Sequence, residues 1–132
     1  AEINRDIFNK SKEWAKYISE ELNYIGTMCV EYFIDKNENL YVNEIAPRVH
    51  NSGHLTLNAY NVSQFENHIR AVCGLHNVET KKLYNAKMIN LLGEDIIVYR
   101  NKKFKDNEFF FDYQKKTVKE KRKMGHLTII EK

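Results

Sequence analysis

Proline and glycine are scarce in this sequence: one proline and five glycines occur among its 132 residues. Such a chain is not a flexible linker, and a hydrophobic content of 42% with 12% aromatic residues is typical of a folded protein. Long apolar runs are also missing, since no segment approaches the ~20 residues that a membrane-spanning helix requires. We therefore expect a folded chain that buries a hydrophobic core and does not enter a membrane.

Cysteine is nearly absent as well. Cys29 and Cys73 lie in apolar contexts and lack the C-x-x-C spacing of redox and metal motifs. No signal-peptide pattern is present. These features predict a protein of the reducing cytoplasm.

Charge is unevenly distributed along the chain. The formal net charge is +3, but residues 101–132 contain ten Lys or Arg against five Asp or Glu. A basic C-terminal third should attract an anion. Composition leaves open whether that anion is a nucleic acid or a small phosphate.

Hydrophobic periodicity predicts an amphipathic helix from Ile3 to Leu22, with apolar residues on one stripe. Two β-favouring runs, Ile25–Asp35 and Leu40–Ala46, flank the polar residues 36–39 and should form a hairpin. Pro47 cannot donate to a strand ladder, so the second strand should end at Ala46 and lead into a loop.

A second helix is expected over residues 63–73. Ser63 and Glu66 have the spacing of a capping box, and Gly74 is suited to the position after the last turn. Beyond it, short apolar or β-branched runs predict mostly antiparallel strands at 87–92, 95–99, 108–113 and 126–130.

Two carboxylates stand out in the predicted hairpin. If the turn is centred between residues 37 and 38, Glu31 lies directly opposite Glu44, with Cβ atoms about 5 Å apart. Like charges so placed destabilise a sheet unless a hard cation bridges them or one acid is protonated, and Mg²⁺ suits carboxylate oxygens better than Zn²⁺. The alternative is that both acids simply face solvent.

Several anion-binding side chains surround this strand end. Asn43 precedes Glu44, and the loop after Pro47 carries Arg48, His50, Asn51, Ser52 and His54. A guanidinium with neutral donors favours a planar or tetrahedral oxyanion. A zinc pair of His50 and His54 is disfavoured because Gly53 opposes the helix that such a pair needs.

A basic cluster, Lys119–Lys123 with Arg122 inside it, precedes the glycine and strand near the C-terminus. It could bind a phosphate, although a solvated charged turn explains it equally well. The aromatic residues are not interleaved with Lys or Arg, so we assign them to packing and not to base stacking.

Five segments together closely resemble the 5-(carboxyamino)imidazole ribonucleotide synthase family, the ATPase subunits of phosphoribosylaminoimidazole carboxylase within the ATP-grasp superfamily. The resemblance covers about residues 18–130, and its most specific motif is Asn43–His54. The segments are Asn43–His54, Ser63–Glu66, Arg70–Val72, Asn90–Gly93 and Arg122–His126.

The resemblance implies an α+β fold in which residues 1–75 are the C-terminal part of an ATP-grasp domain and residues 76–132 a small β-rich domain. It also implies a carboxylase of purine biosynthesis. This reaction converts ATP, bicarbonate and aminoimidazole ribonucleotide to 5-(carboxyamino)imidazole ribonucleotide, ADP and phosphate, through carboxyphosphate. The intact enzyme is expected to be a homodimer that binds no nucleic acid.

By the same resemblance, Glu31 and Glu44 are expected to hold Mg²⁺, and Asn43 and Glu44 to contact ATP. Arg48, His50 and Asn51 are the expected catalytic residues that orient bicarbonate. The expected ligands of the ribonucleotide phosphate are Lys115, Arg122 and Lys123, with Lys116 interchangeable with Lys115.

The chain lacks a glycine-rich, phosphate-cradling loop, so we expect these residues alone to be inactive. Two other functions are possible from the sequence. A basic nucleic-acid-binding module would bind oligonucleotides with steep salt dependence. A metal-dependent hydrolase would need a general base and an enclosed cleft, for which the sequence offers no candidate.

Overall fold

The computed structural model describes residues 4–131, and the chain forms two compact units. Unit 1 comprises Ala1–Gly53 and Gln64–Val78, and unit 2 comprises His54–Ser63 and Glu79–Lys132. Each unit combines helices with an antiparallel sheet, so the α+β prediction is confirmed. Among the described residues, no helix is long and apolar enough to cross a membrane.

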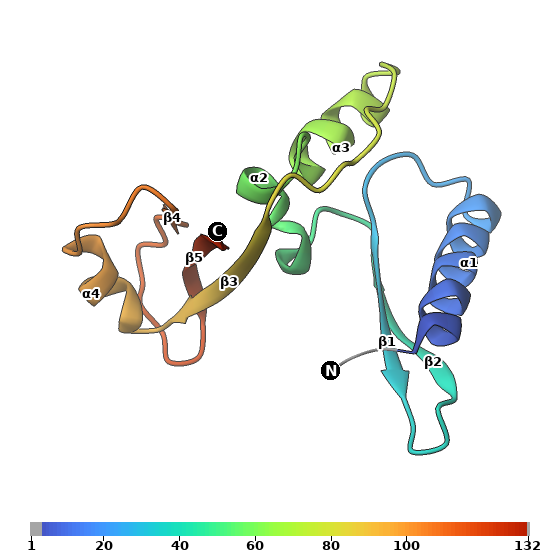
Figure 1. The fold of residues 1–132 in the computed structure, drawn as a ribbon, viewed down its shortest axis with the longest axis horizontal. Helices are drawn as coiled ribbons and strands as arrows, with labels where there is room; N and C mark the ends of the chain where they lie inside the picture. Colours follow the sequence, from blue (N-terminus) through green and yellow to red (C-terminus); the bar gives the residue numbers. More distant parts are fainter. Residues whose placement is uncertain (1–3, 132) are drawn as a thin grey trace. The chain divides into compact units, whose positions relative to one another are not determined.

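Unit 1 is a helix packed on a hairpin, followed by a loop and a second helix (Figure 1). Its elements are α1 (Arg5–Glu21), β1 (Cys29–Ile34), β2 (Leu40–Ala46), the 3₁₀ turn η1 (Asn51–Gly53) and α3 (Gln64–Val72). The first predicted helix is confirmed, although Ile3, its first predicted residue, lies outside the described residues. The predicted bounds of the second strand agree with β2 at both ends.

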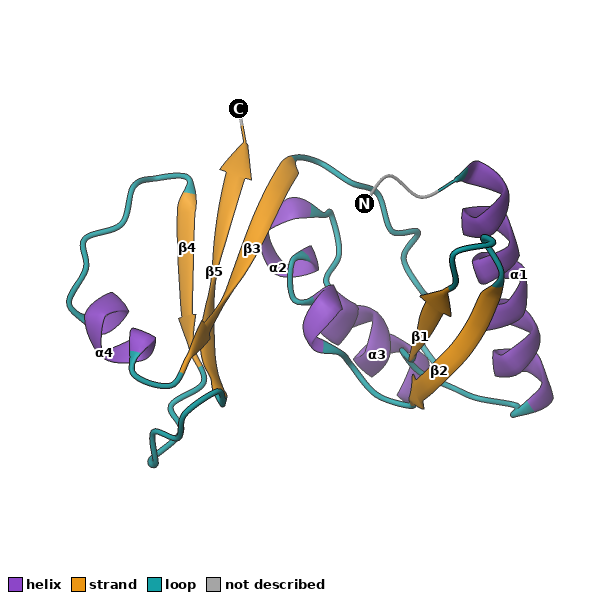
Figure 2. Cartoon of the chain, turned by 90° about the horizontal axis from the view of Figure 1, so that it is seen from below, coloured by secondary structure: helices purple, strands orange, loops and turns teal. Residues whose placement is uncertain are grey.

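Helix α1 begins where Asn4 caps it, because the Asn4 side chain accepts a hydrogen bond from the Asp6 amide at 3.0 Å. The helix lies along the hairpin (Figures 1 and 2). Tyr32 of β1 joins the two, since its hydroxyl donates to the Ser11 carbonyl at 2.8 Å and its ring lies 6.4 Å from that of Trp14. This contact defines the face of the hairpin that α1 covers.

A β-bulge sets the register of the hairpin. Glu31 is opposite Glu44, as predicted, but Tyr32 is opposite Val42, so Asn43 is an extra residue in β2. Side chains alternate along a regular strand, and Val42 and Glu44 would then share a face. The bulge leaves Val42 opposite Tyr32 and turns Glu44 to the side of Glu31.

The hairpin tip differs from the predicted four-residue turn. Ile34 pairs with Leu40, and the Asp35 amide donates to the Asn39 carbonyl at 3.0 Å, which centres the tip on Asn37. The Asp35 carboxylate accepts hydrogen bonds from Asn39 and other tip groups, and these bonds lower its pKa. A regular hairpin with this tip would place Asn43 opposite Glu31, so the predicted pairing of the two acids depends on the bulge.

Helix α3 ends as predicted at Gly74, which has a φ of +67°. The Gly74 amide donates to Ala71 O at 3.1 Å and the Leu75 amide to Arg70 O at 2.8 Å, the two bonds of a Schellman motif. Glycine favours this left-handed conformation because it has no Cβ. The predicted helix over 63–73 is confirmed.

Unit 2 is a three-stranded antiparallel sheet with strand order β3-β5-β4 (Figure 2). Its elements are α2 (Thr56–Ala59), β3 (Asn85–Leu92), α4 (Asp95–Arg100), β4 (Glu108–Asp112) and β5 (Lys123–Glu131). The central strand β5 is almost fully buried from Met124 to Thr128. Leu91, Ile96 and Met124 form the core, and Tyr99, Phe110 and Val118 pack against it.

The strand predicted at residues 95–99 is wrong, because these residues form helix α4. Ile96 is fully buried and Tyr99 packs on the same core, whereas Ile97 and Val98 are 50% and 68% exposed. This spacing of three residues is helical, and burial of one face outweighs the β preference of Ile and Val. Arg100 then pairs with Asp112 of β4 at 2.7 Å.

Gly125 allows strand β4 and helix α4 to approach β5 closely. A methyl group added there would lie 2.5 Å from the Phe111 carbonyl oxygen and 3.0 Å from the Ile96 side chain. We expect Gly125→Ala to destabilise the fold by about 1–3 kcal/mol, because backbone must move to make room. Urea denaturation of wild-type and variant proteins measures this loss.

Gly74→Ala is the comparison for that variant, since its added methyl group meets open space and only the positive φ is unfavourable. We expect a loss of about 1 kcal/mol for it. Equal stability of Gly125→Ala and wild type would show that β4 can shift without cost.

Candidate metal and anion site

The bulged hairpin places two carboxylates together with an imidazole. Ligand atoms of Glu31, Glu44 and His50 all lie within 4.8 Å of one another. The Glu31 side chain is 41% exposed and that of His50 is 15% exposed, so the cluster is open on one side. Both acids therefore point to the same side of the sheet, as the cross-strand prediction requires.

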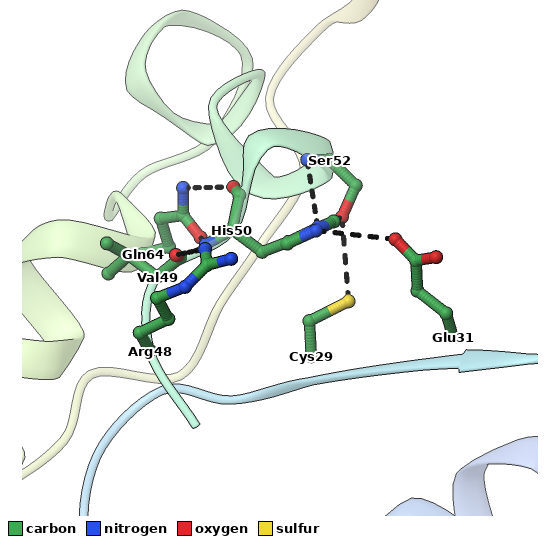
Figure 3. A network of polar contacts seen from close by, with 7 residues as sticks. All are labelled: Cys29, Glu31, Arg48, Val49, His50, Ser52 and Gln64. Atoms are coloured by element: carbon green, nitrogen blue, oxygen red, sulfur yellow. Dashed lines mark hydrogen bonds and ion pairs between the residues drawn. The ribbon is translucent and has the colours of Figure 1, made fainter. Parts of the chain in front are cut away.

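His50 is oriented as a hydrogen-bond donor toward Glu31 (Figure 3). The Ser52 amide donates to His50 Nδ1 at 3.3 Å, and Ser52 Oγ lies 2.9 Å from the same nitrogen. A nitrogen that accepts a backbone N–H carries no proton, so in the neutral ring the proton is on Nε2. That nitrogen lies 3.3 Å from Glu31 Oε1 and faces this carboxylate oxygen.

The donor set fits a hard divalent cation. Mg²⁺ takes oxygen ligands and commonly binds one or two carboxylates together with substrate phosphates. Glu31 and Glu44 would supply those oxygens, while Nε2 of His50, which carries the proton in the neutral ring, would orient the Glu31 carboxylate and not coordinate. The zinc pair considered from sequence gains no support, since the candidate metal cluster among residues 4–131 does not include His54.

Pro47 directs the chain from the acids toward the candidate anion-binding loop, residues 48–54. The Arg48 amide donates to the Ala46 carbonyl at 2.8 Å, which is a tight turn centred on Pro47. The Arg48 side chain is exposed and donates from Nη1 to the Val49 carbonyl at 3.0 Å. Within the described part of the chain Arg48 forms no ion pair, so its remaining N–H groups are available to an anion.

The other predicted residues of this site lie on both sides of Arg48 along the chain. Asn43 is exposed at the bulge, one residue before Glu44. Asn51 begins the η1 turn and is half-buried. Unit 1 thus holds every residue predicted for metal, nucleotide and bicarbonate.

The residues predicted to bind a ribonucleotide phosphate lie together in unit 2. Lys115 Nζ donates to the Lys123 carbonyl at 2.6 Å and lies 5.3 Å from the Tyr113 ring centre. Arg122 and Lys123 are exposed at the start of β5. Lys115 therefore lies beside Lys123, and the choice between Lys115 and Lys116 as a phosphate ligand stays a prediction.

His54 belongs to unit 2, where it packs with half-buried Tyr113 and buried His126. Its ring centre lies 5.3 Å from that of His126 and 5.9 Å from that of Tyr113. Burial and the neighbouring His54 lower the pKa of His126 from 6.5 to about 4, so His126 is neutral at pH 7. The unfolded chain binds that proton more readily, so this group makes the fold less stable as the pH falls from 6.5 toward 4.

The His50 network also contains Ser52, which the sequence suggested only as an anion donor, and Cys29 and Gln64, to which it gave no role in the site. Ser52 fixes its tautomer, Cys29 Sγ lies 3.8 Å from Ser52 Oγ, and Gln64 binds the His50 backbone on both sides (Figure 3). Gln64 was part of a recognised motif, but only the fold shows which backbone it contacts. No sequence signal connects Cys29 to Ser52.

Two family models match the chain. Residues 1–65 match the ATP-grasp domain, and residues 86–132 match the phosphoribosylaminoimidazole carboxylase C-terminal domain. The paired acids thus lie in the ATP-grasp region and the basic residues in the C-terminal region. The chain belongs to the ATP-grasp proteins.

Individual relatives define the family more closely. The N5-carboxyaminoimidazole ribonucleotide synthase of Bacillus subtilis is 41% identical over 131 residues, which are 98% of this chain and 34% of the relative. The synthase of Staphylococcus aureus strain MRSA252 is 43% identical over 127 residues, 95% of this chain and 34% of the relative. The chain therefore belongs to the N5-carboxyaminoimidazole ribonucleotide synthase family and spans about one third of the length of these curated relatives.

Solved structures agree with this assignment. A crystal structure of the Staphylococcus aureus synthetase matches with a TM-score of 0.87 and 42% identity, covering 99% of this chain and 36% of that one. The Aspergillus clavatus synthase in complex with ADP and 5-aminoimidazole ribonucleotide matches with a TM-score of 0.85 and 28% identity, covering 99% of this chain and 37% of that one.

Proposed function

We propose that an intact protein containing this chain is an ATP-dependent carbon–nitrogen ligase of purine biosynthesis. It converts aminoimidazole ribonucleotide, bicarbonate and ATP to 5-(carboxyamino)imidazole ribonucleotide, ADP and phosphate. The observation that carries this proposal is the facing pair Glu31 and Glu44, followed at once by Arg48 and His50, in a chain of this family. The Aspergillus clavatus complex with ADP and the ribonucleotide supports the substrates.

Glu31 and Glu44 are proposed to hold Mg²⁺, with Asn43 and Glu44 near the nucleotide. When bound, Mg²⁺ would neutralise the phosphate oxygens of ATP and polarise the transferred phosphoryl group. The Nε2–H of His50 keeps the Glu31 carboxylate in a fixed orientation. Facing carboxylates are otherwise mutually repulsive, which supports a cation between them.

Arg48, His50 and Asn51 are proposed to orient bicarbonate. An oxygen of bicarbonate attacks the γ-phosphorus of ATP, the bond from that phosphorus to the bridging oxygen of ADP breaks, and carboxyphosphate and ADP form. The phosphorylated form that results carries negative charge on its carboxylate and phosphate oxygens. The planar guanidinium of Arg48 can donate two N–H bonds to them, and it stabilises that charge without reorganisation of water.

The second step joins carbon to nitrogen. The exocyclic amine of aminoimidazole ribonucleotide attacks the carboxyl carbon, the bond from that carbon to the phosphate oxygen breaks, and the amine loses a proton. Lys115, Arg122 and Lys123 are proposed to hold the ribonucleotide phosphate. Their proximity in unit 2 supports this role, because clustered Lys and Arg are the usual ligands of a phosphate.

A phosphate-release assay of the intact protein tests the function. We expect release from ATP to require bicarbonate, aminoimidazole ribonucleotide and Mg²⁺, with one carboxylated ribonucleotide formed per phosphate. Omitting one substrate at a time shows which substrates phosphate release requires. ATP hydrolysis at the same rate with and without bicarbonate and the ribonucleotide would contradict the proposal.

The remaining proposals concern the domains, assembly, location and nucleic-acid binding of the intact protein. We propose an ATP-grasp part over residues 1–75 and a C-terminal part over residues 76–132. We also propose a homodimeric intact enzyme, a cytoplasmic location and no binding of nucleic acid. Free Cys29 and Cys73 support the reducing location.

A further inference from the structure

We propose that Gln64 is a positioning residue for the reaction, because its side-chain amide holds the backbone of His50 and so fixes the bicarbonate-binding loop. This inference rests on the proposed function of that loop. Gln64 is the first residue of helix α3, fourteen positions beyond His50 in the chain. Its bonds to the His50 backbone are the route by which it would act on the site.

The contact between Gln64 and His50 is a two-point clamp (Figure 3). The His50 amide donates to Gln64 Oε1 at 3.0 Å, and Gln64 Nε2 donates to the His50 carbonyl at 2.7 Å. Both polar groups of one peptide residue are thereby satisfied by one side chain. Gln64 is only 9% exposed, so water cannot easily replace these bonds.

The rest of the loop depends on this clamp for its position. His50 lies between strand β2 and the short η1 turn, outside any sheet ladder. Its ring must meet Glu31 on one side and Ser52 on the other, at 3.3 Å and 2.9 Å. Two backbone bonds from a helix remove the freedom that would otherwise let the ring leave this arrangement.

Gly53 gives independent evidence that the amide has a fixed place. A methyl group at Gly53 would overlap Gln64 Oε1 and its carboxamide carbon. The η1 turn therefore packs directly against the clamp. A side chain at position 53 would therefore displace the Gln64 amide, for which Gly53 leaves room.

The same helix contains a matched contact that serves another loop. Asn67 Nδ2 donates to the Val78 carbonyl at 3.0 Å, and the Val78 amide donates to Asn67 Oδ1 at 3.1 Å. This clamp has the same chemistry and also lies in unit 1, but the backbone that it holds is that of Val78. Asn67→Leu is therefore the control for Gln64→Met, since each nearly isosteric change removes one clamp.

The test is made in the intact enzyme. We expect Gln64→Met to raise the KM for bicarbonate about 10-fold or more and to lower kcat, with the KM for ATP within about twofold of wild type. Gly53→Ala, which displaces the amide without removing it, should have the same kinetic effect. Because both changes disrupt one contact, their combination should add little to either alone.

A second measurement does not depend on turnover. The ¹⁵N chemical shifts of the His50 ring should report the single Nε2–H tautomer in wild type and in Asn67→Leu, and averaged tautomers in Gln64→Met and Gly53→Ala. A wild-type bicarbonate KM and an unchanged ring spectrum in a folded Gln64→Met protein would overturn the inference. So would an equal rise of the bicarbonate KM in Asn67→Leu. An inactive wild-type enzyme would instead refute the proposed function.

Discussion

Glu44→Gln is expected to lower kcat of the intact enzyme by about 100- to 1000-fold without loss of fold, because a cation ligand worth several kcal/mol of charge stabilisation is weakened. The change preserves side-chain volume at an exposed strand position, so no packing is lost. It also removes one of two like charges whose ligand atoms lie within 4.8 Å. The steady-state rate at saturating ATP and bicarbonate, measured over a range of Mg²⁺ concentrations, tests this expectation.

Thermal melting separates the role of Glu44 as a ligand from any structural role. In the absence of Mg²⁺, relief of repulsion should leave the variant at least as stable as wild type. Added Mg²⁺ should then raise the Tm of wild type but not of Glu44→Gln, because only a bound ligand stabilises the folded state. Glu38→Gln, at the exposed tip of the same hairpin, is the matched control and should behave as wild type. Near-normal turnover of Glu44→Gln would contradict the metal assignment.

Arg48→Lys is expected to lower kcat/KM for bicarbonate by about 10- to 100-fold, with a much smaller change in the KM for ATP. Lysine keeps the positive charge but cannot present two parallel N–H donors to a planar oxyanion. Within the described residues the Arg48 guanidinium donates to the Val49 carbonyl at an exposed position. The substitution should therefore cost little folding stability. Initial rates at varied bicarbonate, with ATP and ribonucleotide fixed, measure the change.

Arg70→Lys is the control for that substitution. Arg70 also uses its guanidinium for a carboxylate, Glu66, at 2.8 Å, but on the exposed surface of helix α3. An exposed pair of this kind contributes about 0.3–0.5 kcal/mol, so the enzyme should keep its kinetics. If Arg48→Lys had the same bicarbonate dependence as Arg70→Lys, Arg48 would have no part in holding the anion.

Patterns of short range predicted most of unit 1. Apolar periodicity located α1, Pro47 ended β2 at Ala46, and Gly74 marked the end of α3. Each of these signals acts within one or two turns of chain, where local sterics and hydrogen bonding decide the conformation. The pairing of Glu31 with Glu44 was also predicted, but from a four-residue turn that the hairpin does not have.

Signals that depend on distant packing were not readable from the sequence. Residues 95–99 have the β-branched composition of a strand, and only the core around Leu91 and Met124 selects the helix that buries Ile96. The short helix α2 and the η1 turn carry no periodic pattern of their own. The bulge at Asn43 likewise was not readable, because it interrupts the alternation of side chains on which a strand prediction depends.

The candidate site shows the same division. The residue types that suit a cation and an oxyanion were visible in the sequence, but their arrangement was not. The tautomer of the His50 ring follows from its contact with Ser52, and the position of the His50 backbone follows from Gln64. Neither contact could be assigned before the atoms were located. Candidate residue types can be read from the sequence because they are side-chain identities, whereas orientation depends on contacts between separate segments.

Helix α3 protects amide protons that do not belong to it. The N–H groups of His50 and Val78 both donate to its side chains, Gln64 and Asn67. When the helix frays or opens, both protons lose their acceptors in the same event. The amide protons of these two residues, 28 positions apart, should therefore exchange with deuterium at rates governed by one local unfolding equilibrium. The order of the candidate anion-binding loop is then limited by the stability of a nine-residue helix.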